Sequence, residues 1–274
     1  MSSQGTASPS PTPRKPRKVD LPADDVQRFR SELRKFVNVK DEKGRKWTSA
    51  QWGVYAFYDY DGEPIYVGQT NERLSARIGR HLTNQRTDAV AMRILDVFEV
   101  AEAQVWPLWG SEGVNSKSAN FVDAKRDLDA HEYTAYLEAI ENSRFKAILN
   151  EKIPPISDPV ALPPSLRWKL IDDETRRERQ HPDIRIARRA ETISRLAAVA
   201  RERGEVSEGL RRVLVVQAVR LAFIAAERLA FVEGRPPPDP AAISVEPLVG
   251  SVLYEITDPR VGELVGEVDD DRDT

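Results

Sequence analysis

The chain has 274 residues, of which 40% are hydrophobic and 31% are charged, so it can form a hydrophobic core and one or two domains. Its formal net charge of -3 excludes a positive field over the whole chain, so an anionic partner would have to be bound by a local basic patch. Cysteine is absent, which excludes disulfides, thiolate metal sites and a cysteine nucleophile.

The first 22 residues are rich in Ser, Thr, Pro and basic side chains and lack the apolar core of a signal peptide. We therefore expect a disordered basic leader and a cytoplasmic protein. The one membrane candidate, Val213–Phe231, is interrupted by polar and charged residues, well short of the about 20 apolar residues that a spanning helix needs. A buried helix and no membrane partner are predicted.

Charged and apolar residues alternate at helical spacing over Asp24–Phe36, which predicts a short helix. The segment Gly53–Thr70, GVYAFYDYDGEPIYVGQT, contains two aromatic-rich strands around an Asp-Gly turn and predicts a hairpin. Its acids, in DYDGE, span a tight turn without the ligand loop of a calcium site, so we interpret them as a turn. Asn71–Leu82 then predicts a helix with an apolar residue at every fourth position.

Two apolar clusters follow the predicted helix. Ala89–Phe98 predicts a short helix, and Ala103–Trp109 a third strand. A long helix is expected over Phe121–Ser143, and the Pro-rich stretch Ile153–Ser165 marks the end of the first domain.

The C-terminal part is predicted to be mainly helical. Helices are expected over Asp183–Arg203 and Leu210–Phe231, with a break at Gly204 and Ser207 available as an N-cap, which permits a helix-turn-helix-like arrangement. The arginines from position 176 to 212 interleave with glutamates and are interpreted as a solvated helix face. DNA recognition, docking to another protein and a homodimer through these helices all remain open. The apolar run at 250–256 could be a strand.

Four side chains of the first domain can converge on one patch. Tyr55 and Tyr66 lie on the two strands of the predicted hairpin, each near a glycine that keeps the backbone accessible. Arg77 and His81 are four residues apart, so they share one face of the following helix. With a carboxylate from the long helix, the set offers a metal ligand, a charge stabiliser and a proton acceptor, which hydrolysis of a phosphodiester needs.

In this order, GVY, IYVGQT, LSARIGRHL, a helical glutamate and Asn150 resemble the GIY-YIG nuclease superfamily over roughly Trp52 to Asn150. Valines at 54 and 67 replace the isoleucines of the motif, a conservative exchange. The resemblance implies an α/β (α+β) fold in which helices flank a small three-stranded antiparallel sheet. It also implies one divalent cation, Mg²⁺ or Mn²⁺, and cleavage of DNA by water.

By the same resemblance, Tyr55 and Tyr66 match the two motif tyrosines, Arg77 the arginine that stabilises the transition state, and His81 a histidine of several branches. Which tyrosine activates the water stays open. The residues expected to contact the nucleic acid are Arg73, Arg80, Arg86, Arg93 and Asn150.

Two glutamates compete for the role of metal ligand. Glu132 belongs to a properly amphipathic helix, whereas the interval to Asn150 suits Glu138. The two are six residues apart on a helix and point in well-separated directions, so only one can reach the site. Glu132 is preferred, because an insertion before Asn150 costs less than polar residues on a core face.

The predicted segments are a leader (1–22), a GIY-YIG-like nuclease domain with an N-terminal helix (23–156), a Pro-rich linker and connecting segment (157–182), a helical domain (183–235) and a C-terminal segment with an acidic tail (236–274). The leading hypothesis is a divalent-metal-dependent DNA endonuclease of the restriction, defence, recombination or repair type. The alternative is a catalytically inactive module with the same fold that binds nucleic acid or acts as a scaffold.

Overall fold

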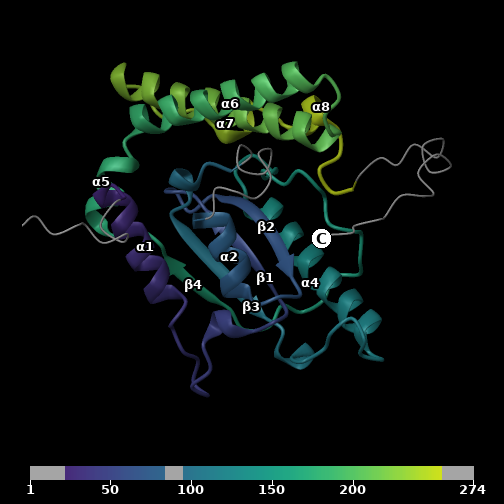
Figure 1. Cartoon of the computed structure of the whole chain (residues 1–274). Helices are drawn as coiled ribbons and strands as arrows, with labels where there is room; N and C mark the ends of the chain where they lie inside the picture. Colours follow the sequence, from purple (N-terminus) through teal and green to yellow (C-terminus); the bar gives the residue numbers. More distant parts are fainter. Residues whose placement is uncertain (1–21, 84–94, 255–274) are drawn as a thin grey trace, which may run out of the picture.

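The computed structural model describes residues 22–83 and 95–254, drawn in colour in Figure 1. The predicted leader (apart from Pro22), Arg86, Arg93 and the acidic tail therefore lie outside the described residues. A mixed α/β fold is confirmed, with an antiparallel sheet in the order β2-β1-β3-β4. The strands are β1 (Gly53–Tyr58), β2 (Pro64–Thr70), β3 (Glu102–Pro107) and β4 (Leu166–Lys169).

The sheet has one strand more than the three that the resemblance implied. The extra strand, β4, comes from the segment predicted to be a linker, and it pairs with β3 from Glu102↔Lys169 to Val105↔Leu166. Its four residues are too few for an alternating pattern to stand out in the sequence. The pairing therefore depends on the partner strand rather than on local preference.

Seven α-helices accompany the sheet in the described part of the chain. They are α1 (Asp24–Phe36), α2 (Leu74–Thr83), α4 (Phe121–Asn142), α5 (Asp173–Arg179), α6 (Pro182–Arg203), α7 (Glu208–Val232) and α8 (Glu246–Val249). Five of them agree closely with the sequence prediction, whereas α5 and the short α8 were not predicted. Short 3-10 turns span Trp47–Ser49, Val97–Glu99, Trp109–Ser111 and Pro240–Ala242. The described part of the apolar run at 250–256 is not a strand, and much of the expected helix at 89–98 lies outside the described residues.

The helices cover the sheet on both faces and at one end. In Figure 1, α2 lies in front of the strands and α4 runs behind β2, and α4 contacts both β2 and β1. Helices α6 and α7 pack side by side across one end of the sheet and form what we call the helical hairpin. Apolar residues of the hairpin, such as Leu196 and Val213, belong to the same buried cluster as Val54 and Phe57 of β1. No helix in the described ranges is long and apolar enough to cross a membrane.

The loop of the helical hairpin agrees with its predicted signals. Gly204 ends α6 with a φ of 69°, and the Ser207 hydroxyl accepts a hydrogen bond from the backbone N–H of Leu210 as the N-cap of α7. The start of α7 also docks on Glu151, whose carboxylate accepts a hydrogen bond from the Ser207 hydroxyl at 2.6 Å. A Cβ at Gly209 would lie 1.8 Å from the backbone oxygen of Glu151, so this close approach requires glycine.

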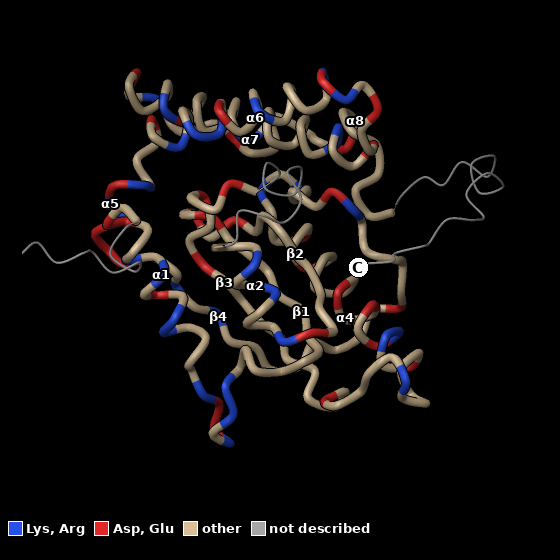
Figure 2. Tube along the Cα trace, in the orientation of Figure 1, with Lys and Arg blue, Asp and Glu red and all other residues tan. Residues whose placement is uncertain are grey.

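The interpretation of the arginines from position 176 to 212 as a solvated face is wrong for several of them. Charges of both signs are spread along α6 and α7 (Figure 2), yet Arg185 and Arg189 are 3% and 6% exposed. Arg220, which that interpretation did not include, is 1% exposed. These arginines meet three acids that are also buried. The buried charge cluster consists of Asp59, Glu63, Glu99, Arg185, Arg189 and Arg220. Arg179 is buried as well, in an ion pair with Asp25.

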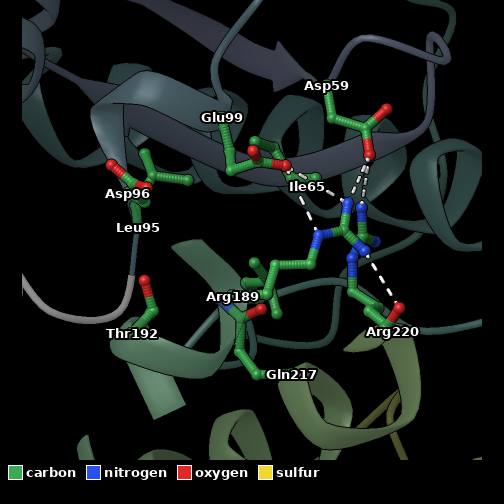
Figure 3. A pocket seen from close by; sticks show the side chains of 10 residues that line it. Asp59, Ile65, Leu95, Asp96, Glu99, Arg189, Thr192, Gln217 and Arg220 are labelled. Carbon is green, nitrogen blue, oxygen red and sulfur yellow. Dashed lines mark hydrogen bonds and ion pairs between the residues drawn. The ribbon is translucent and has the colours of Figure 1, made fainter. Parts of the chain in front are cut away.

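The DYDGE turn is thus more than a turn, because Asp59 is the centre of this cluster. Its Oδ2 atom accepts hydrogen bonds from Arg185 at 2.9 Å and from Arg189 and Arg220 at 3.0 Å each (Figure 3 shows the last two). Burial alone would raise the pKa of Asp59, but the guanidinium charges hold it below its usual value. Burial lowers the pKa of Arg220 to about 10, which leaves it protonated at neutral pH. The cluster therefore joins the helical hairpin to the β1–β2 turn by paired charges.

Candidate active site

The register of the β1–β2 hairpin explains the glycine of the YVG stretch. Tyr55 on β1 pairs with Gly68 on β2, and Phe57 pairs with Tyr66. A Cβ at Gly68 would lie 2.6 Å from the Tyr55 hydroxyl, so only glycine leaves room for that phenol. The rings of Tyr55 and Tyr66 have their centroids 6.2 Å apart, which places both phenols on one face of the sheet.

Helix α2 brings a cation and an imidazole to the same phenol. Leu74, Ile78 and Leu82 are buried against the sheet. The Nε atom of Arg77 lies 3.4 Å from the Tyr55 oxygen, and the Nε2 atom of His81 lies 2.9 Å from it. The structure thus brings together Tyr55, Arg77 and His81, as their spacing predicted.

Proton affinities at this site favour neutral side chains. Burial raises the pKa of Tyr55 well above its usual value, and burial likewise raises the pKa of Tyr66. Burial, with help from the nearby charges of Arg77 and Arg80, lowers the pKa of His81 to about 4. At neutral pH the imidazole is therefore uncharged and can accept a hydrogen bond from the Tyr55 hydroxyl.

The two candidate glutamates on α4 have different surroundings. Glu132 is buried and lines the same pocket as Tyr55, Tyr66 and Arg77, whereas Glu138 is exposed and does not line it. Burial raises the pKa of Glu132 to about 7, and the charge of Lys125 is the largest opposing influence. Glu132 is the glutamate placed to act at the pocket.

The residues expected to contact nucleic acid are placed differently from one another. Arg73 is exposed at the start of α2, and Arg80 forms an ion pair with Glu72. Asn150 is buried, and its amide bonds the backbone N–H and C=O of Val67 at 3.0 and 2.8 Å. In this structure Asn150 ties its segment to β2, and it also lines the pocket. Arg86 lies outside the described residues.

The pocket itself has a volume of about 650 Å³. One wall is built from β2 and α2, with α4 supplying Glu132. The other wall is the segment from Asn150 to Pro155 together with Ser207 at the start of α7. Gln69 and Lys152 were not singled out from the sequence, and Ser207 was singled out only as a helix N-cap. The YVGQT stretch contains Gln69 next to the motif, but nothing in the chain order relates Ser207 to the catalytic segment.

A single buried carboxylate suits a hard cation that keeps most of its water. Among the described residues, no three His, Asp or Glu side chains gather as a ligand set. Two carboxylates line the pocket, of which Glu132 is buried and Glu151 accepts a hydrogen bond from Ser207, so Glu132 is the better placed to hold a cation. No Lys, Arg or His of the described chain lies within ion-pair distance of its carboxylate. The donor set therefore fits Mg²⁺ or Mn²⁺ held by Glu132 and waters.

Comparison with protein families identifies the central segment. The model of the GIY-YIG catalytic domain matches residues 51–111, which include β1, β2, α2 and β3. The resemblance is thereby confirmed: the chain carries a GIY-YIG domain, a domain of nuclease type. Glu132 and Asn150 lie beyond the matched segment. Comparisons with the curated proteins and with the solved structures gave no significant match.

Proposed function

We propose that this protein is a divalent-cation-dependent endonuclease that hydrolyses phosphodiester bonds of DNA. The observation that carries the proposal is that Tyr55, Arg77, His81 and Glu132 line one pocket, within and beside a GIY-YIG domain. A module that only binds nucleic acid needs basic charge and has no use for a buried carboxylate beside a phenol and an imidazole.

Each side chain of the pocket would have its own role in the reaction. The guanidinium of Arg77 faces the pocket and would neutralise charge that develops on the non-bridging oxygens of the phosphate. The Tyr55 hydroxyl, hydrogen-bonded to the neutral His81, would orient the attacking water. The raised pKa of Tyr55 suits this role, because the phenol stays protonated throughout. Tyr66 packs against both rings and would orient them.

Glu132 would hold the cation in the pocket. When bound, the cation supplies positive charge that polarises the phosphate and lowers the pKa of coordinated water. A carboxylate whose pKa is about 7 is only partly ionised at neutral pH, so binding of the cation would compete with a proton there.

The backbone of DNA would be held by basic residues around the pocket. Arg73, directly before α2, and Lys152 on the opposite wall are both exposed, and Lys152 lines the pocket directly. They would contact phosphates on either side of the scissile bond and make binding depend steeply on salt.

The experiment that tests the proposal is nicking of supercoiled plasmid by purified protein with Mg²⁺, Mn²⁺ or EDTA. Arg77→Ala and Glu132→Gln should abolish cutting, by at least about a hundredfold for the arginine. Their matched controls are Arg30→Ala, an exposed arginine of α1, and Glu138→Gln, the exposed glutamate of α4. Both controls should cut like the unsubstituted protein.

Each outcome separates the two readings of the fold. Metal-dependent cutting that is lost only in the pocket variants supports the endonuclease. Salt-dependent binding of DNA without cutting under any cation supports the inactive binding module instead. Equal, mild effects of Glu132→Gln and Glu138→Gln would remove Glu132 from its assigned role.

A further inference from the structure

Three polar side chains behind the pocket wall form a closed set of hydrogen bonds. Lys125 and Asp129 are one turn apart on α4, and the Lys125 ammonium donates to the Asp129 carboxylate at 2.6 Å. Gln69 of β2 joins both: its Nε2 donates to Asp129 at 2.7 Å, and its Oε1 accepts from Lys125 at 3.2 Å. Both ends of the Gln69 amide are therefore held.

The set lies directly beside the proposed cation ligand. Glu132 follows Asp129 by three residues, so the two share one face of α4. Gln69 and Glu132 both line the pocket, whereas Lys125 and Asp129 are not among its lining residues. Gln69 thus stands between the charged pair and the pocket.

The Lys125 ammonium is paired with Asp129 and forms no ion pair with the Glu132 carboxylate. Burial raises the pKa of Glu132; the Lys125 charge opposes this rise from a distance, and a hydrogen bond from the neutral Gln69 amide opposes it as well. An amide can fix the orientation of a carboxylate by a hydrogen bond without competing as a counter-ion. Side chains that hydrogen-bond a metal ligand without touching the metal orient that ligand. Their removal commonly weakens metal binding by about 10- to 100-fold.

We propose that Gln69, held by Lys125 and Asp129, is a positioning residue that fixes the Glu132 carboxylate toward the pocket for a divalent cation. The proposal rests on the proposed function and extends it to residues that do not touch the substrate. A surface ion pair between Lys125 and Asp129 that only stabilises α4 would have no need of a partner on β2.

Helix α4 contains a matched control for this idea. Arg126 is adjacent to Lys125 and pairs with Asp123 at 3.4 Å, but both of these side chains are more than three-quarters exposed and neither lines the pocket. Arg126→Met therefore removes the same charge and a similar helix ion pair without reaching Gln69.

The test measures binding of Mn²⁺ alone, by its electron paramagnetic resonance signal, beside plasmid nicking as a function of Mn²⁺ concentration. Gln69→Leu and Lys125→Met should weaken Mn²⁺ binding by about 10- to 100-fold. Their cutting rate at saturating Mn²⁺ should approach that of the unsubstituted protein. Lys125→Arg should restore binding, and Arg126→Met should bind as the unsubstituted protein does.

Several results would overturn the inference. If Gln69→Leu and Lys125→Met bind Mn²⁺ normally while Glu132→Gln does not, the positioning role is refuted and the proposed function stands. An equal loss of Mn²⁺ binding in Arg126→Met would show a general effect of helix charge, and it would also refute the positioning role of Gln69. If the unsubstituted protein neither binds Mn²⁺ nor cuts DNA, both proposals fail. Should Lys125→Met not fold, Gln69→Leu, which leaves α4 intact, decides the outcome alone.

Discussion

Replacement of Asp59 by Asn tests whether the buried charge cluster holds the helical hairpin in place. The Asp59 carboxylate is 1% exposed and accepts hydrogen bonds from three guanidinium groups and from two backbone N–H groups of its own turn. Asn keeps the shape but removes the charge, which leaves three buried arginines facing Glu63, Glu99 and the partly exposed Asp61. Removal of one partner from a buried ion pair costs about 3–5 kcal/mol, because the remaining charge stays desolvated.

The expected loss is therefore about 3–5 kcal/mol in the free energy of unfolding. At about 2–4 °C per kcal/mol, the midpoint of thermal unfolding should fall by about 6–20 °C. Urea unfolding followed by circular dichroism measures the first quantity. The control is Asp123→Asn on α4, an acid that is 78% exposed and pairs with the exposed Arg126, and it should cost less than about 1 kcal/mol. A loss below about 1 kcal/mol in Asp59→Asn would refute the idea that this cluster is structurally essential.

Three further predictions concern the pocket. The folded pKa of His81, about 4, lies below its unfolded value, so the unfolded chain binds the proton first as pH falls. Between pH 6.5 and 4, the titration of His81 should lower the free energy of unfolding by up to about 3 kcal/mol. His81→Gln should remove this part of the pH dependence. Parallel curves of unfolding free energy against pH for the two proteins would contradict the prediction. Gly68→Ala should displace the Tyr55 phenol and reduce plasmid nicking far more than stability, whereas unchanged nicking would show that this phenol is dispensable. Gly209→Ala, which clashes with the Glu151 backbone, should cost about 1–3 kcal/mol in urea unfolding, and a neutral result would mean that α7 can shift.

The helices and strands whose own residues show a clear periodicity or turn signal were predicted from the sequence. The bounds of α1 agree with those expected, and the β1–β2 hairpin, α4 and α7 were predicted from periodicity, turn residues and apolar runs. The juxtaposition of Arg77 and His81 followed from a spacing of four residues, which any α-helix converts into one face. The choice of Glu132 as the residue facing the site followed from the amphipathic pattern of its helix, and the structure buries Glu132 and exposes Glu138.

What escaped prediction depends on partners that are distant in the chain. Arg185, Arg189 and Arg220 are 126 to 161 residues away from Asp59, the acid that they share. A helix face rich in arginine and glutamate has the composition of a solvated surface. Its arginines can be buried only because acids that face them in the fold pair with their charges. Strand β4 escaped for the same kind of reason, since its four residues acquire a sheet partner only when β3 lies beside them.

The buried charge cluster bears on whether the helical hairpin is a separate module. A separate target-binding module would be joined to the catalytic domain by a flexible linker and a small polar interface. Here the hairpin shares the hydrophobic core of the sheet, and its buried arginines neutralise acids of the β1–β2 turn. Ser207, at the start of α7, also lines the pocket that holds Tyr55 and Glu132. Removal of the hairpin would thus expose apolar core, leave buried acids unpaired and open one wall of the pocket, so the helical part belongs to the same folding unit as the site.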